Sequence, residues 1–175
     1  MSFETRFTPE EQAVLISLPN MTGSAMAFAE GSGLGTVKEM IANSRSFLKG
    51  KEITGNEIIS AIMPNIVSIR EAMQESKEMR EIVSRRLKSR EIESKEQLRD
   101  LALEDAATVN GILNAKAQPE EAAQYKNWVL DIAEDVSKAA KEGVFLGFGG
   151  TQVSENEKDL FIELADALGV QRSMR

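Results

Sequence analysis

The sequence predicts an all-α protein, a compact bundle of about seven helices, and three observations support this. Apolar residues recur with the 3.6-residue period of an amphipathic helix along most of the 175 residues. Helix-start patterns mark the expected first turn of three helices, and strand-like alternation never lasts beyond a few residues outside 151–153. Because 42% of residues are hydrophobic, the chain can build one packed core. We expect a single domain over residues 1–175, with flexible tails at 1–7 and 170–175.

The first expected helix begins at a capping box. Thr8 can cap the first turn, Pro9 suits the first helical position, and Glu11 completes the box. Pro19 is expected to break or kink this helix, because proline has no N–H to donate and clashes with the preceding turn. A second helix is then expected over 21–29.

The next helices are interrupted by glycine and proline. Apolar residues on one face predict a helix over 37–48. A longer apolar stripe over 58–73 keeps its period across Pro64, which predicts one kinked helix. Residues 77–90 hold six basic and two acidic residues. We expect them to form a solvated helix surface, and the alternative is a basic face for an acidic partner.

Two long helices are expected in the second half of the chain. Ser94 and Gln97 form a capping-box pattern before an apolar stripe, and Pro119 marks the start of the next helix. That helix carries the only tyrosine and the only tryptophan, Tyr125 and Trp128, on its apolar face. We expect both rings to lie in the core, and the alternative is an aromatic recognition pair.

The last expected helix begins at the Ser154 and Glu157 capping box and ends at Gly169. Before it lies an apolar, glycine-rich loop without the spacing of a P-loop or a dinucleotide site. Its large apolar side chains would form a conspicuous patch in water, so we expect a groove of the same chain or a partner subunit to cover them. Anion binding by its backbone amides is a further alternative. The expected interaction residues are Phe145, Leu146, Gly147, Phe148, Gly149 and Gly150.

Two parts of the chain share a plan, which suggests two pseudo-symmetric helical hairpins. Each has a helix of small residues, a Glu-Gly pair, a glycine-rich turn and a second helix with an early glutamate. The first runs from Ala25 through Glu30 and Glu39, and the second passes through Glu142 and Glu157. Coincidence between helix-capping patterns is the alternative.

Three short motifs carry a resemblance to a known family. The motifs are AAKEG at 139–143, VSENEK at 153–158 and ADALG at 165–169. They resemble the tellurite-resistance TerB-like helical domains, and the resemblance covers roughly 25–48 and 128–170. It implies a compact all-helical fold, acidic loop residues that hold divalent cations, and stress-response partners at the membrane.

The acidic residues near these turns are candidate ligands for calcium or magnesium. Hard cations prefer oxygen ligands, and the glycine turns expose backbone carbonyls beside the carboxylates. No EF-hand spacing occurs, and acids in a first helical turn also suit the helix dipole, so capping and solvation are the alternative. The candidate ligands are Glu30, Glu39, Glu142, Glu155 and Glu157.

The residue inventory argues against most catalytic chemistry. The chain has no cysteine and no histidine, which excludes thiolate and imidazole nucleophiles, the usual zinc sites and histidine bases. A Ser137–Lys138 dyad would point to different faces of one helix. We predict no catalytic residue, and a small hydrolase that uses carboxylates is the remote alternative.

Charge and hydropathy limit the expected partners. A net charge of −7 disfavours nucleic acid, and no apolar stretch is long enough to cross a membrane. No signal peptide is seen, so we expect a cytoplasmic protein. The prediction is a non-enzymatic helical module for protein interaction or stress response, with a protein partner or a second copy as ligand. A divalent-cation binding protein is the alternative.

Overall fold

The computed structural model describes residues 2–29, 45–63, 77, 81–141 and 153–174. Every regular element in these ranges is a helix, which confirms the all-α prediction, and residues 45–48 and 81–89 are helical as well. The remaining elements are α1 (Phe3–Arg6), α2 (Pro9–Phe28), the 3-10 helix η1 (Lys49–Glu52), α4 (Glu57–Ile62), α6 (Lys95–Lys116), α7 (Pro119–Lys141) and α8 (Glu155–Ala167).

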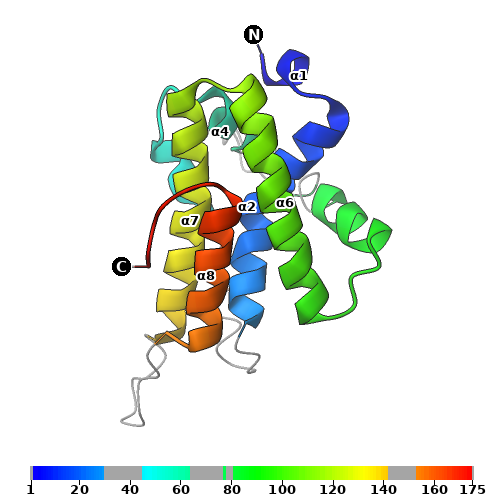
Figure 1. Cartoon of the computed structure of the whole chain (residues 1–175). Coiled ribbons are helices and arrows are strands. Elements are labelled where there is room, and N and C mark those ends of the chain that lie inside the picture. The colour runs from blue at the N-terminus through cyan, green and yellow to red at the C-terminus, as the bar shows by residue number, and fades with distance from the viewer. Residues whose placement is uncertain (1, 30–44, 64–76, 78–80, 142–152, 175) are drawn as a thin grey trace.

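Four long helices form the body of the bundle (Figure 1). Helix α2 packs against α6 and α7, and α8 packs against the same two helices. Helices α2 and α7 run in one direction and α6 and α8 in the other. We call the end that holds α1, α4 and the start of α7 the upper end. The lower end holds the last turn of α2 and the first turns of α6 and α8.

The core is centred on the aromatic residues of α7. Tyr125 and Trp128 are 0% and 2% exposed and meet edge to face, with ring centroids 5.8 Å apart. Phe47 also packs on the indole, with ring centroids 5.4 Å apart. A Cβ at Gly50 would lie 2.9 Å from the same indole, so only glycine lets η1 approach this closely. The prediction that both rings belong to the core is confirmed.

Helix α2 runs without a break through Pro19, so the predicted break is wrong. Proline cannot donate to the carbonyl four residues earlier, which leaves the Leu15 carbonyl without its helical partner. The hydroxyl of Tyr125 donates to that carbonyl at 2.6 Å. Because this long-range hydrogen bond replaces the missing one, the helix continues with Pro19 buried inside it.

Helix α4 ends at Ile62, so the predicted kinked helix across Pro64 is also wrong. Met63 has extended backbone angles, φ −72° and ψ 131°. A proline disfavours the helical conformation of the residue before it, which accounts for the end of α4 at this position.

The three predicted capping boxes and the predicted end of the last helix at Gly169 are confirmed. All three capping boxes are present at the starts of α2, α6 and α8. Helix α8 ends in a Schellman motif, in which the Gly169 N–H donates to Asp166 O and the Val170 N–H donates to Ala165 O, both at 2.9 Å. Gly169 has φ +67°, and a Cβ there would lie 3.0 Å from the side chain of Asn110.

Both segments that the sequence analysis assigned as tails are packed against the bundle. Residues 2–7 contain α1 and its C-cap Phe7, and the rings of Phe3 and Phe7 are both buried, with their centroids 5.2 Å apart. Residues 170–174 lie against α7, where side-chain contacts hold them.

A buried ion pair joins three elements at the upper end. Arg6 donates to both oxygens of Glu121, at 2.7 and 2.9 Å, and the Ile58 N–H donates to the same carboxylate at 3.3 Å. Asn56 caps α4 through the Ile59 N–H and donates to the backbone carbonyl of residue 121. Burial acts to raise the pKa of Glu121, but the hydrogen bonds and charge of Arg6 outweigh it and lower that pKa below its ordinary value.

Candidate functional site

Two of the candidate metal ligands lie in the first turn of α8, where each has a partner. The Glu157 carboxylate accepts from the Ser154 N–H at 2.9 Å and is 3% exposed. Glu155 is exposed and pairs with Lys158 at 2.7 Å. Across the described part of the chain, no three acidic side chains gather where they could hold a metal ion. The structure therefore gives Glu157 a capping role.

The other predicted site residues lie outside the described residues. They are Glu30, Glu39, Glu142 and all six residues of the glycine loop, Phe145, Leu146, Gly147, Phe148, Gly149 and Gly150. The first of the two proposed hairpins falls largely in the same undescribed part. These expectations stay predictions.

The basic segment, residues 77–90 of the sequence, contacts α6 through two arginines in its described part. Arg86, on the 81–89 helix, pairs with Asp105, which is 2% exposed, and Arg90 pairs with Glu104 at 2.8 Å. Burial raises the pKa of Asp105 above its ordinary value, although Arg86 acts in the opposite direction. Part of the basic charge is therefore neutralised by this chain's own carboxylates.

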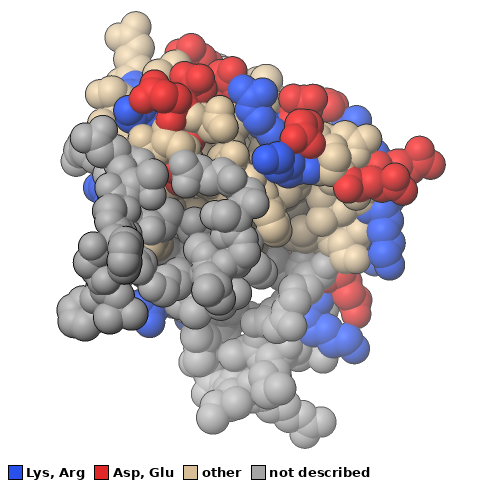
Figure 2. All heavy atoms as spheres, turned by 90° about the horizontal axis from the view of Figure 1, so that it is seen from below, with Lys and Arg blue, Asp and Glu red and all other residues tan. Residues whose placement is uncertain are grey.

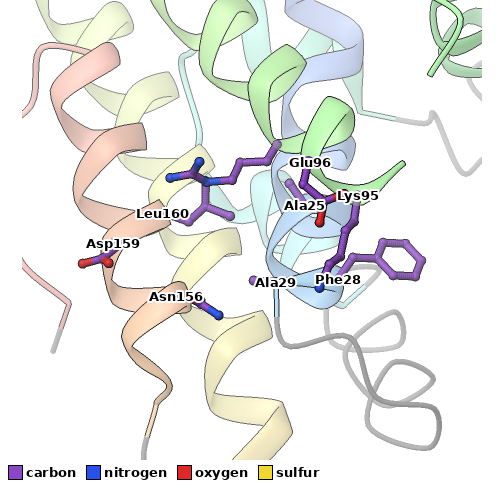
Figure 3. Close-up of a pocket in the computed structure, with 9 residues that line it drawn as sticks. Ala25, Phe28, Ala29, Lys95, Glu96, Asn156, Asp159 and Leu160 are labelled. Atoms are coloured by element: carbon purple, nitrogen blue, oxygen red, sulfur yellow. The ribbon is translucent and has the colours of Figure 1, made fainter. Parts of the chain in front are cut away.

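A hollow of about 270 Å³ lies at the lower end, between the last turn of α2 and the first turns of α6 and α8 (Figure 3). We call it the lower-end hollow. Three helix ends meet there, and each contributes side chains. The described residues that line it are Ala25, Phe28, Ala29, Lys95, Glu96, Arg99, Asn156, Asp159 and Leu160.

The lower-end hollow has an apolar base and a charged rim. Ala25 and Leu160 are buried, and Phe28 is 38% exposed at the edge of the hollow. Arg99 pairs with Glu163 on α8. Figure 2 views the molecule from below and shows acidic and basic side chains interspersed on the described surface, without a large region of one sign.

Three rim residues have charges that are not used within the described chain. Lys95, Glu96 and Asp159 are exposed, and none forms an ion pair with a described residue. Lys95 is the first residue of α6, at the positive end of the helix dipole, where a cation is unfavourable. Helix stability therefore does not explain a lysine at this position.

The described lining of the lower-end hollow carries an amine, a guanidinium, carboxylates and an amide, and it has no hydroxyl side chain. These groups can form ion pairs and hydrogen bonds with a charged or polar surface. This site was not among the predicted ones, although Lys95 directly after a capping residue is a signal that could have found it.

Comparison with known proteins adds no relative: no family model, no curated protein and no solved structure matches this chain. The resemblance to TerB-like domains therefore stays a prediction from the sequence. Among the described helices, none is both long and apolar enough to cross a membrane.

Proposed function

We propose that the chain is a non-enzymatic protein-interaction module that binds a second copy of itself through the lower-end hollow. The observation that carries the proposal is a set of charges of both signs that form no ion pair with a described residue and lie beside an exposed aromatic ring. Lys95 and Asp159 have no described ion partner, and Phe28 is 38% exposed at the same place. An exposed aromatic ring is a residue type that protein interfaces use as an anchor.

A second copy fits this surface because its charges are self-complementary. In a two-fold contact the same patch occurs on both subunits, so a residue on one subunit meets a different residue on the other. The amine of Lys95 can then meet the Asp159 carboxylate of the other copy, and both Phe28 rings lose contact with water. Aromatic residues are enriched in protein interfaces, and charged residues occupy their rims, which suits Phe28 and the charges at this end of the bundle.

The test compares two exposed apolar residues by sedimentation equilibrium. Phe28→Ser removes a ring at the hollow, and Ile162→Ser removes a side chain that is 51% exposed on α8 and does not line the hollow. We expect self-association of the parent chain, weakened about tenfold or more by Phe28→Ser, which corresponds to about 1.4 kcal/mol. Ile162→Ser should leave it unchanged.

Two outcomes would contradict the proposal. One is a parent chain that stays monomeric at every concentration, and the other is an equal effect of both substitutions. The glycine loop gives a second pair of variants, Phe145→Ser and Phe148→Ser. If the loop contributes to the same interaction, each lowers the oligomer mass more than it lowers the stability of the monomer.

The cation-binding alternative has a separate test. Thermal unfolding is measured in chelator and then with calcium or magnesium. An ion at 100 times its dissociation constant stabilises the folded state by about 2.7 kcal/mol. A rise that disappears in Glu30→Gln or Glu142→Gln would support these residues as ligands, and an unchanged transition would remove them from consideration.

A further inference from the structure

The C-terminal segment (residues 170–174) crosses from the end of α8 onto α7 (Figure 1). Val170, Arg172 and Met174 are partly buried, whereas the residues between them are exposed. This alternation is that of an extended chain with one face against a surface. The segment therefore presents an arginine between two apolar side chains to the helices beneath it.

Arg172 makes the central contacts. Its Nη2 donates to Asp131 Oδ1 at 2.6 Å and to Glu134 Oε2 at 2.7 Å, and its Nη1 donates to the Asn127 carbonyl at 3.4 Å. The guanidinium also lies 6.0 Å from the centre of the Phe161 ring. The arginine side chain is only 13% exposed, so it fills a formed site.

The surface under this segment is an acidic site on α7 with an apolar neighbour. Asp131 and Glu134 are three residues apart and therefore face the same side of the helix. Burial acts to lower the pKa of Arg172, but hydrogen bonds and charge from the two carboxylates raise it above its ordinary value. The Met174 sulfur lies 3.5 Å from Ser137 Oγ, which extends the contact along α7.

Within the described structure, the side chains of Arg172 and Met174 attach the segment beyond Val170. Within the described residues, no backbone-to-backbone hydrogen bond joins residues 171–174 to α7. The last such bond is the one that Val170 donates to Ala165 O in the Schellman motif. Another chain with the same side-chain pattern could therefore replace residues 171–174 without disturbing the end of α8.

We infer that this face of α7 and α8 is a binding site for an extended segment of a partner protein that carries an arginine and, two residues after it, an apolar side chain. The C-terminal segment occupies the site in cis. A tethered ligand acts at an effective concentration of the order of millimolar, so it masks the site from weaker ligands in solution. This inference does not depend on the lower-end hollow, which involves other faces of the bundle.

The experiment adds the segment back as a peptide. The full chain with Arg172→Ala and the parent chain are labelled with ¹⁵N and titrated with the peptide Gln-Arg-Ser-Met, which has the sequence of residues 171–174. The control peptide has glutamine in place of arginine. We expect the first peptide to shift the amide signals of Asp131 and Glu134 in Arg172→Ala, and to bind the parent chain about tenfold more weakly because the cis segment competes.

Three results would overturn the inference: no shift in folded Arg172→Ala, equal shifts with both peptides, or equal affinity for both proteins. If Arg172→Ala does not fold, Met174→Ala takes its place, because Met174 lies at the far end of the segment and is only partly buried. Adding Asp131→Asn to the variant should weaken binding of the arginine peptide, since it removes one of the two carboxylates.

Discussion

The two ends of the bundle use charge in different ways. At the upper end, a cavity of about 790 Å³ is lined by charged residues that include Arg6 and Lys116, and both cations are ion-paired. At the lower end, Lys95 and Asp159 line a smaller hollow and have no described ion partner. The paired cations at the upper end join helices, whereas Lys95 and Asp159 at the lower end form no ion pair with a described residue. The two ends should therefore respond oppositely to substitution.

The largest expected effect is at the upper end. Arg6→Met leaves the Glu121 carboxylate, 10% exposed, without its main partner. Breaking a buried pair in this way costs about 3 kcal/mol, because one charge remains buried and uncompensated. Urea unfolding at neutral pH measures the loss. If Arg6→Met lowers the free energy of unfolding by less than the loss of an ordinary surface ion pair does, the charges at the upper end do not hold the helices together as argued.

The stability that Arg6→Met loses should also depend on pH. Since the pKa of Glu121 is lowered in the folded parent chain, its contribution is present at neutral pH and is lost as the pH falls through that pKa. Without Arg6, burial raises the pKa of Glu121, and the carboxyl group takes up a proton earlier on acidification. The stability gap between Arg6→Met and the parent chain should therefore narrow as the pH falls. A gap independent of pH would contradict the assignment.

Tyr125→Phe tests the hydrogen bond that lets α2 continue through Pro19. The change removes the hydroxyl that donates to Leu15 O and leaves that buried carbonyl unpaired. The expected cost is about 2 kcal/mol in the free energy of unfolding. Pro19→Ala should reduce the cost, because alanine supplies its own N–H to the carbonyl. A double-mutant cycle measures this coupling, and strict additivity would argue against it.

At the lower end, Ser154→Ala tests whether Glu157 is a capping residue. The substitution removes the hydroxyl that accepts from the Glu157 N–H at 3.2 Å. The expected cost is about 1 kcal/mol, typical of a lost helix cap. Chemical unfolding with and without calcium measures it. The same cost under both conditions fits a cap, and a calcium-dependent cost would favour a metal ligand.

The smallest expected effect has the opposite sign. Lys95→Glu replaces a cation at the start of α6 by an anion, which suits the helix dipole. The free energy of unfolding should rise by about 0.5 kcal/mol. Thermal and urea unfolding of the monomer measure the change. A loss of stability would show that Lys95 has a structural partner and would weaken the contrast between the ends.

Local chemistry explains which features the sequence could predict. The capping boxes, the terminating Gly169 and the buried Trp128 depend on nearby residues and on helical period, and all were predicted. The continuity of α2 depends on Tyr125, which is 110 residues from Leu15, so proline in the sequence could indicate only a break. No short-range pattern records such a contact.

The lower-end hollow and the docking of residues 170–174 were missed for the same reason. The hollow exists because three helix ends that are distant in sequence meet in the fold. The segment is held by Arg172, whose partners Asp131 and Glu134 lie about 40 residues earlier in the chain. The extended segment has no helical period, and nothing in the neighbouring sequence distinguishes its arginine from an ordinary solvated charge.

The most direct test of the account is a charge exchange at the lower-end hollow. Lys95→Asp and Asp159→Lys are made separately and together, and the dissociation constant of the self-association is measured by sedimentation. In a two-fold contact between these residues, each single change places like charges opposite each other and weakens association, and the double change restores it. That restoration is the predicted result. If the double variant associates as weakly as the single variants, or more weakly, the account is contradicted.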